Sequence, residues 1–178
     1  MSTLRRFAIA FGTVIAAAAG QGAEAQEIPQ PLLGNCCSCT GAIRDDTGLG
    51  LDTIRVATRV VPVSFMNPFD EGFTLELVSG AVPVFSASLA PGDMDENLFG
   101  RRWTWHDPGA RSSGGFSRVL VQEMAGALGG FLIHVYAYGD LSAAADPSMT
   151  VRIAIGGDSF FDTSLWTERD NGFRHGFW

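Results

Sequence analysis

Three cysteines in one short segment are the residues of this sequence best able to do chemistry. They form the run Cys36-Cys37-Ser38-Cys39. Thiolates bind copper(I) or zinc, but zinc sites usually take two separated pairs of ligands, so these thiols would need a further ligand from elsewhere. In an oxidising compartment, neighbouring thiols tend to pair with each other. We therefore expect a disulfide rather than a metal site among Cys36, Cys37 and Cys39, and a spare thiol able to join two chains in a covalent dimer.

A serine, an aspartate and a histidine near the C-terminus raise the question of hydrolysis. The run Gly157-Asp158-Ser159 resembles the start of a family of serine esterases, whose motif opens an α/β domain that an Asp-x-x-His pair closes. Here the run is near the end of the chain, and four residues separate Asp170 from His175. The sequence contains neither a Gly-x-Ser-x-Gly nor a His-Glu-x-x-His motif. A secreted hydrolase using Ser159, His175 and Asp158 is therefore an alternative, and we assign no catalytic residue.

Two tryptophans could form a binding platform. Trp103 and Trp105 are two residues apart, so their side chains share one face of a strand. An exposed pair of this kind stacks on sugar rings, with His106 and Asp107 as the polar groups beside it. The competing interpretation is that both indoles pack in the core, where large aromatic side chains contribute much of the stability.

Three acidic residues gather in the segment Gly92-Asp93-Met94-Asp95-Glu96-Asn97. Carboxylate oxygens are the ligands that calcium prefers, and exported domains meet calcium outside the cell. Asp93, Asp95 and Glu96 are therefore a possible calcium site, although their spacing is not that of an EF-hand. The alternative is a solvated turn between two strands, and we expect no other cofactor.

The elements that would position these residues read as short strands separated by turns. Their candidate ranges are 54–65, 73–79, 82–89, 101–106, 116–124, 131–138, 149–155 and 161–167, with Pro, Gly and Asp clusters between them. His134, Tyr136 and Tyr138 share a face of one strand and predict an exposed sheet. The only helix-like segment, 141–145, is ended by Asp146-Pro147. We predict an all-β antiparallel sandwich of about eight strands, jelly-roll or immunoglobulin-like.

The N-terminal residues 1–25 predict a cleavable signal peptide. Arg5 and Arg6 precede an uncharged apolar run, and Ala23-Glu24-Ala25 has the small-x-small order of a cleavage site. The apolar run is shorter than the roughly 20 residues needed to span a bilayer, so we expect no membrane anchor. Residues 26–50 predict an extended arm that carries the cysteines, and residues 51–178 predict the sandwich domain. The expected location is periplasmic or extracellular.

Charge then narrows the class of function. After cleavage the chain has ten arginines, no lysine and eighteen acidic residues, a net charge of −8. Such a balance does not favour nucleic acid or anionic membrane as partners. We expect a binding or structural module for a glycan or a protein rather than an enzyme. A small outer-membrane β-barrel, suggested by the aromatic end Phe177-Trp178, is a second alternative, although its terminal strand lacks apolar alternation.

Overall fold

A computed structural model describes residues 30–31, 40–44, 51–62, 65–97, 99–125, 130–169 and 172–175. The predicted signal peptide and the three cysteines lie outside these residues. Over the described ranges the chain is mostly β, with antiparallel sheets and two helices of four residues each. Neither of these helices has the length and apolar character needed to cross a membrane.

Five strands form the smaller sheet, in the spatial order β1, β11, β10, β4, β5. Neighbouring strands are antiparallel except for β1, which runs parallel to β11. The strands of this sheet are β1 (Gln30–Pro31), β4 (Phe73–Ser79), β5 (Val82–Leu89), β10 (Ser148–Ile155) and β11 (Asp158–Leu165).

Eight strands form the larger sheet, in the order β12, β13, β2, β3, β9, β8, β7, β6, and all its pairs are antiparallel. Its strands are β2 (Thr40–Arg44), β3 (Asp52–Val60), β6 (Asp95–Glu96), β7 (Arg102–His106), β8 (Gly115–Glu123), β9 (Phe131–Gly139), β12 (Thr167–Arg169) and β13 (Gly172–His175). The helices are α1 (Pro68–Glu71), before β4, and α2 (Ala110–Ser113), between β7 and β8.

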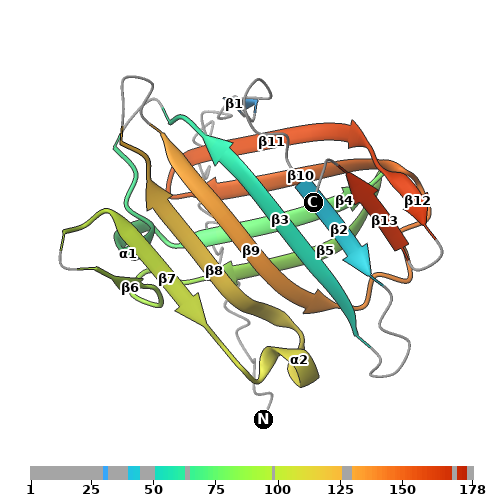
Figure 1. The fold of residues 1–178 in the computed structure, drawn as a ribbon, viewed down its shortest axis with the longest axis horizontal. Helices are drawn as coiled ribbons and strands as arrows, with labels where there is room; N and C mark the ends of the chain where they lie inside the picture. Colours follow the sequence, from blue (N-terminus) through green and yellow to red (C-terminus); the bar gives the residue numbers. More distant parts are fainter. Residues whose placement is uncertain are drawn as a thin grey trace, which may run out of the picture.

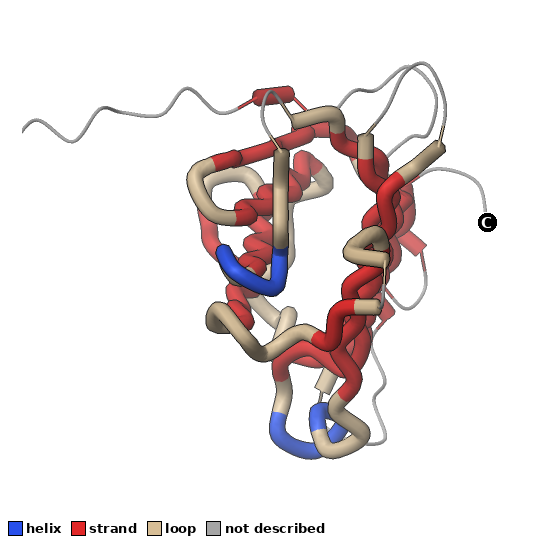
Figure 2. Tube along the Cα trace, turned by 90° about the vertical axis from the view of Figure 1, so that its left-hand side faces the viewer, coloured by secondary structure: helices blue, strands red, loops and turns tan. Residues whose placement is uncertain are grey.

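The two sheets face each other in a sandwich-like arrangement. Figure 1 shows the larger sheet in front of the smaller one, with the strands of the two running in different directions, and Figure 2 shows the same layers from the side. Burial alternates residue by residue along β4, as a sheet packed on one face requires. One hydrophobic core lies between the sheets. Among its largest wholly buried side chains are Trp103, Phe73, Phe160, Ile54, Met66 and Leu75.

All eight strands predicted from the sequence are confirmed. β4 and β5 begin and end where predicted, and β7, β8, β9 and β10 do so within one residue. β3 ends at Val60, short of the predicted Phe65, because Pro62 lacks the N–H that a strand ladder requires. Segment 141–145 is irregular with a short turn rather than helical. The five further strands are short, and β1 and β2 lie inside the predicted arm, where each pairs into one of the sheets.

Two glycines fix the start of a long strand in each sheet. Gly72 precedes β4 with φ of 79°, and Gly130 precedes β9 with φ of 99°. A Cβ at Gly72 would lie 2.7 Å from the carbonyl oxygen of Leu89, and one at Gly130 would lie 2.6 Å from that of Val60. Both positions therefore require glycine, for the positive φ and for the close approach of the neighbouring strand's last residue.

A buried hydroxyl joins the end of β4 to the turn before β10. Ser79 is 2% exposed. Its hydroxyl donates to the carbonyl oxygen of Asp146 and accepts from the backbone N–H of the same residue, each at 2.8 Å. The pair satisfies polar groups that would otherwise be costly to bury, and it fixes the turn against the sheet.

Candidate functional site

The cysteine cluster is the one group of predicted site residues that the structure leaves open. Cys36, Cys37 and Cys39 lie between the described segments 30–31 and 40–44. The disulfide and the covalent dimer therefore stay predictions. Elsewhere, each predicted site residue can be located in the fold or, for His175, in its backbone.

The tryptophans of β7 point inward. Trp103 is 0% exposed and donates its indole N–H to Glu96 Oε1 at 3.0 Å, while Trp105 is partly buried against the core. His106 is exposed at the end of the strand, and Asp107 accepts the N–H of Gly109 at 2.7 Å in the turn that follows. Trp103 therefore has no face to offer a sugar, and the predicted aromatic platform is not formed at the surface. The alternative interpretation, core packing, describes where this side chain lies.

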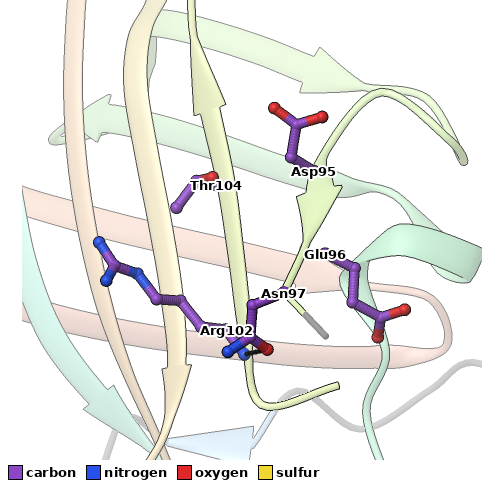
Figure 3. Close-up of a pocket in the computed structure, with 5 residues that line it drawn as sticks. All are labelled: Asp95, Glu96, Asn97, Arg102 and Thr104. Carbon is purple, nitrogen blue, oxygen red and sulfur yellow. Dashed lines mark hydrogen bonds between the residues drawn. The ribbon is translucent and has the colours of Figure 1, made fainter. Parts of the chain in front are cut away.

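The acidic segment before β7 does not gather its carboxylates. Asp93 accepts the N–H of Ala90 at 2.7 Å and so closes a turn. Asp95 and Glu96, adjacent on β6, point away from each other (Figure 3), and Glu96 is the partner of the Trp103 indole. No group of three histidine, cysteine or acidic residues able to hold a metal ion occurs within the described parts of the chain. The three predicted calcium ligands are thus apart in this structure.

A hollow of about 300 Å³ lies on the same hairpin. Asn97, one of the residues around it, accepts the backbone N–H groups of Arg101 and Arg102 with its side-chain oxygen, at 3.0 and 3.2 Å. The Arg102 guanidinium points away from both carboxylates (Figure 3), so the hollow does not combine opposite charges. It is lined by Asp95, Glu96, Asn97, Arg102 and Thr104.

The backbone does not bring the proposed hydrolytic residues together. Ser159 lies near the start of β11 in the smaller sheet. His175 ends β13 in the larger sheet, and β13 pairs with β12, which follows the far end of β11. The extended chain between Ser159 and the end of β11 spans about 20 Å. Asp158 is next to Ser159 and pairs across the turn with Ile155.

The outer face of the smaller sheet satisfies its own polar groups. Arg152 forms a salt bridge with Glu76 at 3.0 Å across the β10–β4 pair. The hydroxyls of Thr150 and Thr163 are 2.8 Å apart, and a similar pair joins β4 to β5. Cross-strand pairs of this kind stabilise a sheet but leave little unsatisfied hydrogen-bonding capacity for a partner.

The outer face of the larger sheet is different. One row across four strands holds Arg55 on β3, Tyr136 on β9, Arg118 on β8 and His106 on β7, each paired in register with the next. All four side chains are exposed. We refer to these four residues as the arginine row. The Arg55 guanidinium carbon lies 5.2 Å from the centroid of the Tyr136 ring, a cation–π contact that orients it.

Charges near the arginine row are mostly positive. Arg59 and Arg102 lie on the same outer face, two rows further along the strands. Asp95, at the edge strand β6, is the only acidic residue among the outward-facing described residues of β3 and β6 to β9. Neither Arg55 nor Arg118 forms an ion pair with a described residue, in contrast to Arg152. Arg55 and Arg118 can therefore accept an anion without first breaking an ion pair with a described residue.

Part of this face was visible in the sequence. His134, Tyr136 and Tyr138 were predicted to share an exposed face, and Tyr136 is exposed while the other two are half-buried. Arg55 lies between Ile54 and Val56, and this alternation of polar and apolar residues indicates that Arg55 faces outward. No protein-family model, no curated protein and no solved structure matches this chain.

Proposed function

We propose that this chain is an exported binding module, in which the two facing sheets form a β-sandwich scaffold and a glycan or protein partner lies on the outer face of the larger sheet. The observation that supports this proposal is the arginine row. Its two arginines are exposed and have no ion-pair partner among the described residues, whereas the arginine on the opposite outer face is paired. Arginine is favoured in ion pairs at interfaces, and its guanidinium stacks on aromatic faces, as that of Arg55 does on Tyr136.

A pair of double variants tests the location of the binding face. Arg55→Gln with Arg118→Gln removes both cations of the arginine row, and Arg152→Gln with Glu76→Gln neutralises the ion pair on the opposite face. The exported protein and both variants are applied to a glycan array and to a panel of purified exported proteins. We expect the control variant to keep the partners of the unchanged protein and the face variant to lose at least about tenfold in affinity. Equal losses in both variants, or no bound partner for the unchanged protein, would contradict the proposal.

Export is tested separately by intact mass under non-reducing conditions. Expression with the native N-terminus in a secreting host is expected to give a protein that begins at Gln26. A mass two hydrogens below the reduced value would show one disulfide, and a doubled mass would show a covalent dimer through the spare thiol. Retention of residues 1–25 in the secreted fraction, or a protein confined to the cytoplasm, would contradict export.

A further inference from the structure

The charge and spacing of the arginine row indicate which kind of ligand it binds, given the proposed binding function. The whole chain is acidic, with a net charge of −7, yet the outer face of its larger sheet carries two arginines, Arg55 and Arg118, that form no ion pair with a described residue. An arginine on a surface of this kind gains little from its position unless an anion is supplied from outside. We therefore expect a partner that contacts the arginine row to carry negative charge there.

Spacing narrows the choice of anion. Neighbouring strands lie about 4.8 Å apart, so Arg55 and Arg118, with β9 between them, are about 10 Å apart at the backbone. Tyr136 stands midway. The row thus offers cation, aromatic ring and cation in sequence, along a line that runs across the strands. A disaccharide unit has a comparable length, with an acid group on one ring and a flat hydrophobic face on the other.

Arginine suits the charged groups of such a ligand. Its guanidinium places two N–H donors in a fork that matches a carboxylate or a sulfate. Arg55 is held in place by the ring of Tyr136, so binding costs less side-chain entropy than it would for a free arginine. The phenol of Tyr136 is available to donate a hydrogen bond to a sugar hydroxyl.

The overall acidity of the chain argues against more densely charged polymers. Duplex DNA carries one charge per roughly 1.7 Å of its axis, so a strand longer than the row would meet the acidic remainder of the protein. An acidic polypeptide has the same disadvantage, because its charges can recur at every residue. We propose that the arginine row binds an anionic polysaccharide whose carboxylate or sulfate groups are regularly spaced along the chain.

The test uses charged and uncharged forms of a glycan, with a polypeptide and an oligonucleotide as competing polyanions. Binding of the exported protein is measured by calorimetry with an oligogalacturonate, its methyl-esterified form, unmodified dextran, poly-glutamate and a single-stranded oligonucleotide. We expect binding to the oligogalacturonate, at least about tenfold tighter than to its esterified form. Arg55→Gln and Arg118→Gln should each weaken it about tenfold, and Tyr136→Leu should weaken it as well. Arg152→Gln, on the other outer face, serves as the charge-matched control and should change little.

Arg55→Lys separates the fork from the charge. If the bidentate contact matters, this variant binds several times more weakly than the unchanged protein although its net charge is the same. Circular dichroism of each variant shows whether the fold is kept. Equal affinity for the esterified and acidic forms would overturn the inference while leaving a glycan-binding function intact. Preference for poly-glutamate or the oligonucleotide would overturn the polysaccharide assignment, and absence of binding to every probe would overturn the inference as a whole.

Discussion

Replacement of Trp103 tests whether the aromatic pair of β7 stabilises the fold or serves a ligand. Trp103 is wholly buried, and the ring centroids of Trp103 and Phe131 are 5.9 Å apart. Trp103→Ala would leave a large cavity between the two sheets. Substitutions of this kind in protein cores lower the free energy of unfolding by about 3–5 kcal/mol. We expect a loss in that range. It is a large share of the free energy of unfolding of a typical domain, which is about 5–15 kcal/mol.

The hydrogen bond of the indole contributes a smaller part. Trp103→Phe keeps an aromatic ring but removes the donor to Glu96, whose carboxylate is exposed and can be solvated by water instead. We expect this bond to contribute on the order of 1 kcal/mol, in addition to the cost of the lost volume. A double-mutant cycle with Glu96→Ala isolates that interaction, because it subtracts the effects of the two single substitutions.

Equilibrium unfolding in urea, followed by far-ultraviolet circular dichroism, measures these differences without relying on tryptophan fluorescence. Trp105→Ala is the matched control, since Trp105 lies on the same strand face but is only partly buried, and it should cost less. If Trp103→Ala does not fold, Trp103→Phe still reports the direction. A loss below about 1 kcal/mol for Trp103→Ala, with an unchanged denaturant slope, would refute the assignment of this side chain to the core.

Three other positions test the fold in independent ways by the same unfolding measurement. Gly130→Ala forces a Cβ against a backbone carbonyl at a positive φ, so we expect the free energy of unfolding to fall by about 1–3 kcal/mol or more. Gly92 also has a positive φ, but a Cβ there would meet nothing within 4 Å, so Gly92→Ala shows how much of that loss is backbone strain alone. Ser79→Ala leaves polar groups of the following turn unsatisfied and should cost about 1–3 kcal/mol, and a change near zero would show that water replaces the hydroxyl. Hydrogen bonds from Ser142 lower the pKa of Asp140 below its usual value; the bond from the backbone N–H has the larger effect and the bond from the hydroxyl the smaller one. Because the pKa is lower in the folded chain, the stabilisation by Asp140 is present above the unfolded pKa of about 3.9 and is lost as pH falls through the folded pKa. Asp140→Asn should therefore remove a small acid-sensitive part of the stability, and an unchanged pH dependence in this variant would contradict that assignment.

The long strands could be predicted from the sequence because their signal is local. In β10, Val151, Ile153 and Ile155 alternate with outward residues, and turn residues flank the strand, so its position follows from a short window. The single-turn helices lack such a signal. From the sequence, Asn67-Pro68 predicts a turn. In the structure Asn67 caps α1, which has only four residues and is too short to show a helical pattern. The short strands β1 and β2 depend on partners far along the chain, so no window around them could reveal the pairing.

The candidate site was less predictable, because it depends on orientation and register. The sequence placed Trp103 and Trp105 on one face but did not decide which face was inward. The polar residues that alternate with them on β7, Arg102 and His106 among them, were a usable signal for the inward direction of the indoles. The arginine row could not be predicted from alternation within a strand, since it forms only when β3, β9, β8 and β7 pair in one particular register. A shift of one residue in any strand would turn its member toward the core.

The contrast between the two outer faces constrains any partner more than the total charge does. On one outer face the chain pairs Arg152 with Glu76 at 3.0 Å. On the other face it keeps Arg55 and Arg118 exposed, with no acidic residue in their row. At a Debye length of about 8 Å in physiological salt, the distant acids are largely screened, whereas an anion in contact with the row is not. A net negative chain can therefore bind an anion at this face, provided that the ligand places its charges on the row and few of them elsewhere.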